Sequence, residues 1–162
     1  MEEVITFNNL KSVLLDFAIA TQNKYKDNLL LSDRLATGEL IKSVQYKTTF
    51  NDREFIISLD LENYWKWVED DTRPHFPPVN AILSWIKAKP VLPYPDKRGK
   101  LPTPNQLAYL IGRKISIEGT KGTHDLEKTL KTLNAEYEVL IAEALEKDLS
   151  NSIDNIFIMF HS

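Results

Sequence analysis

Apolar residues recur at helical spacing near both ends of the chain. Near the start, steps of three and four positions predict an amphipathic helix over about residues 6–25. Near the end, a 4-3-4-3-4 spacing predicts a longer helix whose apolar seam is Leu126, Leu130, Leu133, Tyr137, Leu140 and Ala144. The polar residues 150–152 are expected to break this helix, leaving an apolar tail over residues 150–162.

Two segments between these helices have the composition of strands. "SVQYKTTF" and "REFIISLDL" are rich in β-branched and aromatic residues, and Asn51–Asp52 between them is typical of a turn. They predict an antiparallel β-hairpin, preceded by a short helical segment in "TGELIKSV". Because two strands alone are marginally stable in water, the hairpin is expected to pack on a helix or to extend another sheet.

Prolines divide the part of the chain that follows the hairpin. A short helix in "YWKWVE" is expected to end before Pro74, because the residue preceding a proline is disfavoured in helical geometry. "PPVNAILSWIKAK" predicts a second helix, and a third opens at Pro104, with Thr103 as its cap and Gly119 at its end. Residues 89–104 are expected to form a long loop that its prolines stiffen.

These elements predict an α+β fold, with amphipathic helices packed around a small antiparallel β-hairpin and a long proline-rich loop. A chain of 162 residues with 43% hydrophobic residues has enough core material for a single domain over residues 1–162.

Composition excludes several classes of site. There is no cysteine, and no two of the three histidines have the spacing of ligands on one helix turn, so neither a metal nor another cofactor is expected. No apolar run approaches the length of a membrane span, and the first residues carry acids where a signal peptide has bases. We expect a soluble protein made in the cytoplasm, without a membrane partner.

The stretch from Tyr64 to Ile86 looks like a site because it holds all three tryptophans, an acidic triplet and a histidine. Glu69, Asp70 and Asp71 beside His75 are candidates for general acid–base work. Three adjacent acids on a turn point in different directions, however, and nothing else supplies a nucleophile or a metal partner. We interpret the acids as a solvated helix end, and we do not expect an enzyme. Most of the tryptophans are expected in the core, with either Trp65 or Trp67 peripheral because the two cannot share one helical face.

Basic residues cluster in the proline-rich loop. Lys97, Arg98 and Lys100, with Lys89, are opposed there only by Asp96, so the loop is suited to project toward DNA or an acidic neighbour. A second basic group, near Lys114, suggests an alternative function: a small DNA-binding regulator with a helix-turn-helix-like segment around residues 103–149. The helix that would enter the major groove has a net charge of −4 between residues 125 and 148, which opposes phosphate binding.

The order of three motifs resembles the neck, or head–tail joining (tail-completion), proteins of tailed bacteriophages. The first is a Thr-Gly-x-Leu-x-x-Ser segment, and the second is an aromatic-rich helix leading to a Pro-Pro-apolar-x-x-Ile-x-x-Trp-Ile helix. The third is an Ile-Gly-Arg-Lys-Ile-like helix ending in Gly-Thr. The matching residues are Thr37, Gly38, Leu40, Ser43, Pro77, Pro78, Val79, Ile82, Trp85, Ile86, Ile111, Arg113, Ile115, Gly119 and Thr120.

The resemblance implies a structural virion protein that is not an enzyme. Such a subunit forms a ring around the DNA channel, between the portal-connector and the tail tube or tail terminator, after assembly in the host cytoplasm. Its partners are then other copies of itself, those portal and tail proteins, and packaged DNA through non-specific contact. The candidate interface or DNA-channel residues are Lys97, Arg98, Lys100, Trp67, Ile156, Phe157 and Phe160.

Overall fold

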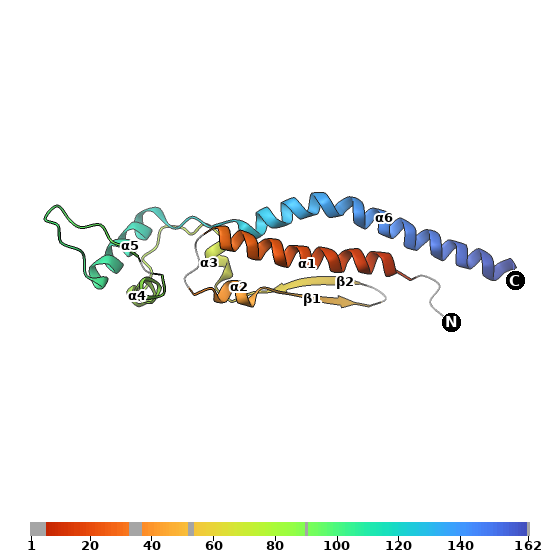
Figure 1. Ribbon diagram of the computed structural model, residues 1–162, viewed down its shortest axis with the longest axis horizontal. Helices are drawn as coiled ribbons and strands as arrows, with labels where there is room; N and C mark the ends of the chain where they lie inside the picture. The colour runs from red at the N-terminus through yellow and green to blue at the C-terminus, as the bar shows by residue number, and fades with distance from the viewer. Residues whose placement is uncertain (1–5, 33–36, 52–53, 90, 162) are drawn as a thin grey trace. The chain divides into compact units, whose positions relative to one another are not determined.

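The computed structural model describes residues 6–32, 37–51, 54–89 and 91–161. Its elements in chain order are α1 (Asn8–Leu31), α2 (Glu39–Ser43), β1 (Gln45–Phe50), β2 (Phe55–Asp60), α3 (Trp65–Glu69), α4 (Val79–Ala88), α5 (Pro104–Glu118) and α6 (Asp125–His161) (Figure 1). The described residues are therefore mostly helical, with one two-stranded antiparallel hairpin, in agreement with the predicted mixture of helices and hairpin.

Contacts divide the chain into two compact units. The hairpin unit comprises Met1–Asn28, Val44–Leu61 and Leu126–Ser162, and the short-helix unit comprises Leu29–Ser43 and Glu62–Asp125. The single domain expected over residues 1–162 stays a prediction.

In the hairpin unit, α1 lies between the β-hairpin and α6 (Figure 1). On one side, the rings of Phe7 and Phe55 lie 5.8 Å apart, and the Tyr46 N–H donates to the Gln22 side chain at 2.9 Å. On the other side, the Phe17 ring lies 5.2 Å from that of Tyr137. The hairpin therefore packs on a helix, which is one of the two supports expected for it.

The hairpin buries one of its two faces. Residues of β1 and β2 alternate between half-buried and exposed, and the register pairs Tyr46 with Leu59 and Phe50 with Phe55. The Asn51 side chain accepts the Glu54 N–H at 2.9 Å at the end of the strands, while Asp52 of the predicted turn lies outside the described residues.

Two predictions about α6 are wrong. Leu140 of the predicted seam is 45% exposed, because the buried stripe instead follows Thr129, Leu133, Ala144, Asp148 and Ser152. Residues 150–152 do not break the helix, which continues to His161. The Ser152 hydroxyl donates to the Asp148 carbonyl at 2.8 Å, a bond that leaves the helix intact.

In the short-helix unit, α4 packs against α5 through small residues. Ala108 and Gly112 of α5 are buried, and an added Cβ at Gly112 would lie 3.0 Å from the Phe76 ring and 3.3 Å from Ile82. Thr103 and Gln106 form a capping box at the start of α5, as the predicted cap requires. Residues 91–103 form no helix or strand, Pro90 lies outside the described residues, and the stiffness of the loop stays a prediction.

Candidate functional site

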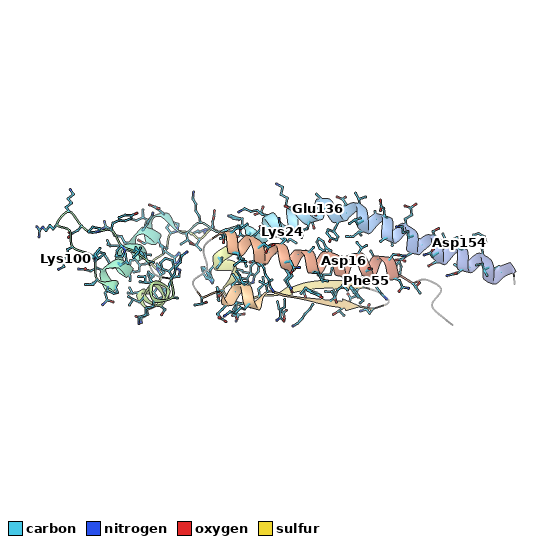
Figure 2. All side chains as sticks on the ribbon, in the orientation of Figure 1. Asp16, Lys24, Phe55, Lys100, Glu136 and Asp154 are labelled. Atoms are coloured by element: carbon cyan, nitrogen blue, oxygen red, sulfur yellow. The ribbon has the colours of Figure 1, made fainter. Side chains whose placement is uncertain are left out.

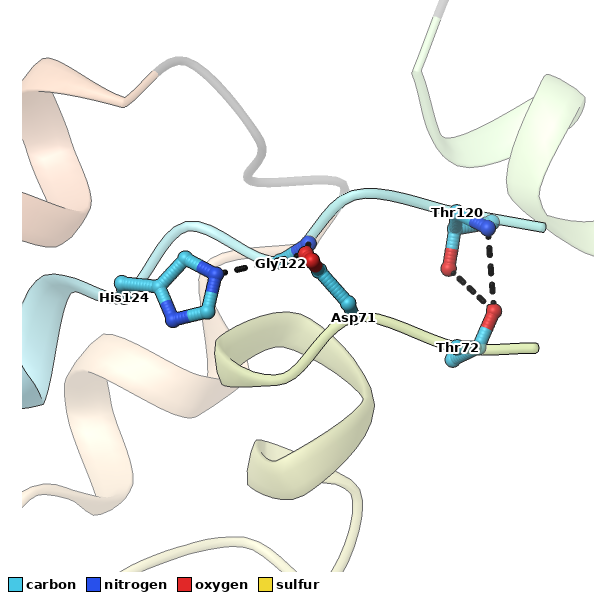
Figure 3. Close-up of polar contacts among 5 residues, drawn as sticks. All are labelled: Asp71, Thr72, Thr120, Gly122 and His124. Carbon is cyan, nitrogen blue, oxygen red and sulfur yellow. Dashed lines mark hydrogen bonds and ion pairs between the residues drawn. The ribbon is translucent and has the colours of Figure 1, made fainter. Parts of the chain in front are cut away.

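Residues 68–72 and 120–124 are joined by a set of hydrogen bonds that we call the polar clasp. The N–H groups of Thr123 and His124 donate to the carbonyls of Val68, at 2.9 Å, and of Glu69, at 3.1 Å. Thr72 and Thr120 form an isolated bridge, in which the Thr120 N–H donates to the Thr72 hydroxyl at 3.0 Å (Figure 3). The clasp ties the end of α3 to the segment between α5 and α6.

Asp71 is the charged member of the polar clasp. Its Oδ1 accepts the Gly122 N–H at 2.7 Å and lies 3.2 Å from His124 Nε2 (Figure 3). The Gly122 N–H, and then the His124 ring, hold the pKa of the Asp71 carboxyl below its usual range.

The acid–base cluster considered from sequence is not assembled. Asp71 contacts His124 rather than His75, whose Nδ1 lies 2.8 Å from the Arg73 carbonyl. Glu69 is buried, so the interpretation of the whole triplet as a solvated helix end is wrong for this residue. The signal that sequence reasoning missed is the pair Gly119 and Gly122, where an added Cβ would lie 2.1 Å and 2.0 Å from the carbonyl oxygens of Thr72 and Glu69.

The prediction that most of the tryptophans lie in the core is wrong, because none of the three is fully buried. Trp67 is 67% exposed, Trp85 is 39% exposed and Trp65 is half-buried. Trp67 is the peripheral one of the Trp65–Trp67 pair, and its exposure suits the interface role predicted for it. Together with Trp85 it lines a groove of 640 Å³ whose other apolar walls are Val68, Pro77, Ala81, Ile82, Ile111 and Ile115.

The last turns of α6 expose an apolar surface. Phe157 is 61% and Phe160 82% exposed, and Ile156 is half-buried. These predicted interface residues share a helical face, about 100° wide, with Leu149 and Ile153, which sequence reasoning did not select. We call these five residues the apolar stripe; Ile158, 66% exposed, lies on the opposite face.

Asp148 fixes where α1 begins along α6. Asp148 is 2% exposed, and its carboxylate accepts the N–H of Asn9 at 3.1 Å, the N–H of Leu10 at 2.8 Å and the Asn9 side-chain amide at 2.7 Å. Burial alone would raise the pKa of this carboxyl, but the three hydrogen bonds outweigh burial and lower it. Residues 149–161 therefore extend past the start of α1 by about 20 Å of helix, a segment on which Figure 2 labels Asp154.

The three predicted basic residues of the loop are all exposed. Lys97, Arg98 and Lys100 lie in a turn over residues 96–100, and Figure 2 labels Lys100 there. The alternative regulator hypothesis places a helix-turn-helix-like segment around residues 103–149. Within this range, Gly112 of α5 faces Phe76 and Ile82 inside the short-helix unit, whereas α6 from Leu126 belongs to the hairpin unit.

No protein-family model, curated protein or solved structure matches the chain. Among residues 6–32, 37–51, 54–89 and 91–161, no three His, Asp or Glu side chains gather as a metal site. Within the same described ranges, no helix is both long and apolar enough to cross a membrane.

Proposed function

We propose that this chain is a structural subunit of the neck of a tailed bacteriophage, a head–tail joining (tail-completion) protein that acts by shape and assembly. It forms a ring around the DNA channel and binds the portal-connector on one side and the tail tube or tail terminator on the other. It is made in the host cytoplasm and functions in the virion. The observation that carries the proposal is the apolar stripe on the end of α6.

The stripe has the chemistry of a protein-binding helix. Its residues are spaced as the anchors of an amphipathic helix that lies in a groove, and Asp154 is the only carboxylate between residues 149 and 161. Soluble chains seldom expose Phe157 and Phe160 together with the neighbouring apolar residues unless a partner covers them.

A second apolar surface supports assembly into a ring. The groove lined by Trp67 and Trp85 lies in the short-helix unit, whereas the stripe lies in the hairpin unit. Two different surfaces on one chain are what a head-to-tail contact needs, and such contacts form a ring when the rotation between subunits closes. The three motifs that resemble neck proteins lie mainly in the short-helix unit and are independent of the stripe.

The test compares charges placed on the two faces of one helix end. Ile153→Lys/Phe160→Lys places two charges on the stripe, whereas Ile158→Lys places a charge on the opposite, equally exposed face. In the phage that encodes this protein, the gene for each variant replaces the unaltered gene. The particles that form are then examined by electron microscopy. We expect the stripe variant to yield filled heads and separate tails, with joined particles reduced at least tenfold, because buried unpaired charges oppose association.

Ile158→Lys should leave joined particles at the unaltered level. Normal joining with the stripe variant would contradict the proposal for the stripe. A gene located among genes unrelated to virion structure would contradict the neck function itself.

A further inference from the structure

A turn in the middle of the proline-rich loop is ordered by its own aspartate. The Asp96 N–H donates to the Lys100 carbonyl and the Gly99 N–H to the Asp96 carbonyl, both at 2.9 Å. The Asp96 carboxylate accepts the N–H of Arg98 at 2.8 Å and of Lys100 at 2.9 Å, and Gly99 supplies the positive φ of +75°. We call residues 96–100 the basic turn.

The basic turn presents its cations to solvent. Lys97, Arg98 and Lys100 are exposed, and in the described part of the chain no carboxylate side chain forms an ion pair with any of them. The single acid of the turn, Asp96, directs its oxygen at backbone N–H groups rather than at the cations. The side chains of the turn therefore present a net positive surface held in one backbone conformation.

Tyrosines extend this surface into a groove. Arg98 and Lys100 line an open groove of 890 Å³ together with Tyr94 and Tyr109, which are 93% and 55% exposed. Asn105, at the start of α5, adds an amide. Arginine, lysine, tyrosine and asparagine are among the side chains that contact the sugar–phosphate backbone of DNA, and such contacts carry no sequence information.

We propose that the basic turn and this groove bind the phosphate backbone of duplex DNA without sequence preference. The choice of DNA over an acidic protein rests on the proposed function, which places the chain around a DNA channel. The three cations neutralise up to three phosphates, so log K falls against log salt with a slope of about −2.7. A ring multiplies this weak contact, because every subunit engages the same duplex.

The experiment uses the full chain and a fluorescent duplex of about 20 base pairs, with anisotropy measured between about 50 and 200 mM salt. We expect binding to weaken about 40-fold over that range, as the slope requires. Arg98→Gln/Lys100→Gln removes two of the three cations, so the slope should fall to about −0.9 and binding at low salt should weaken at least tenfold.

Two control variants locate the contact. Lys24→Gln removes an exposed cation from α1 and should change neither slope nor affinity. Binding that Lys114→Ala abolishes and the turn variant does not would assign DNA to α5, in favour of the regulator, and overturn the proposal. Circular dichroism of each variant confirms that the fold is retained.

A competition measurement distinguishes DNA from an acidic protein as the ligand of the basic turn. A poly-glutamate peptide of the same total charge should displace the duplex poorly; equal or better displacement would make an acidic protein the partner and overturn the proposal. Absence of duplex binding at low salt would also overturn it. Neither result affects the particle-joining test of the apolar stripe, so a failure of DNA contact and a failure of the neck function are distinguishable.

Discussion

Asp148 shows how one side chain connects two helices. Its carboxylate takes the place of an N-cap for α1, although it comes from α6, and it satisfies two backbone N–H groups at the helix start. Removing the carboxylate leaves both N–H groups without this acceptor, and the N–H of Leu10 is at a buried position. We expect Asp148→Ala to lower the free energy of unfolding by about 2 kcal/mol, in urea titrations at neutral pH.

Glu146→Ala is the matched control, because Glu146 is an exposed carboxylate on the same helix. The sign of the pH effect follows from the lowered pKa of Asp148: its stabilisation is present above the unfolded value of about 3.9 and is lost as the pH falls through the folded value. The stability difference between Asp148→Ala and the unaltered chain should therefore shrink below about pH 4. A constant difference down to about pH 2 would contradict the assignment.

At the scale of elements, short-range signals were sufficient for most boundaries. Thr103 and Gly119 bound α5 as predicted, since capping depends on neighbours in sequence. The predicted break at residues 150–152 is wrong because it rests on the polarity of Ser152, whose hydroxyl donates to the Asp148 carbonyl of the same helix. The sequence does indicate which face of α6 is buried, because Asp148 and Ser152 continue from Ala144 in steps of four.

Gly119 and Gly122 indicate a close backbone approach in the polar clasp, but the segment that approaches them lies about 50 residues away in the chain and could not be predicted. Propensity and periodicity describe neighbours, and nothing in either segment alone identifies the other. The same limit explains the tryptophans: composition favours them in a core, but the groove beside Trp67 and Trp85 depends on how α4 packs against α5.

The closest approach in the polar clasp is between Gly122 and the Glu69 carbonyl. Gly122→Ala forces the Glu69 carbonyl away from a Cβ that would lie 2.0 Å from it, so the clasp must open. We expect a loss of about 2 kcal/mol in urea unfolding followed by tryptophan fluorescence.

Gly112→Ala is the contrasting variant in the same unit. Its Cβ would lie 3.0 Å from the far end of the Phe76 ring, a side chain that is 49% exposed, and alanine is favoured in a helix interior. The stability change should be within about 1 kcal/mol of zero. Equal losses of stability in Gly122→Ala and Gly112→Ala would show that the polar clasp is no more sensitive to an added Cβ than the contact of α4 with α5.

At the scale of the whole molecule, the backbone passes between the two units four times, after Asn28, Ser43, Leu61 and Asp125. One passage is inside α1, where Tyr25 belongs to the hairpin unit and Leu29, one turn later, belongs to the short-helix unit; both side chains are buried. Unfolding either unit removes the support for this turn of α1. We therefore expect a single cooperative transition, as the single-domain prediction requires.

The chain offers a separate probe for each unit. All three tryptophans lie in the short-helix unit, whereas α1 and α6, which supply most of the helical circular dichroism, lie mainly in the hairpin unit. Asp148→Ala alters only the hairpin unit, yet in a cooperative molecule it lowers the urea midpoint equally by fluorescence and by circular dichroism. Gly122→Ala should do the same from the short-helix unit. If the urea midpoint moves only in the signal that reports on the unit carrying the substitution, the two units are domains that unfold independently.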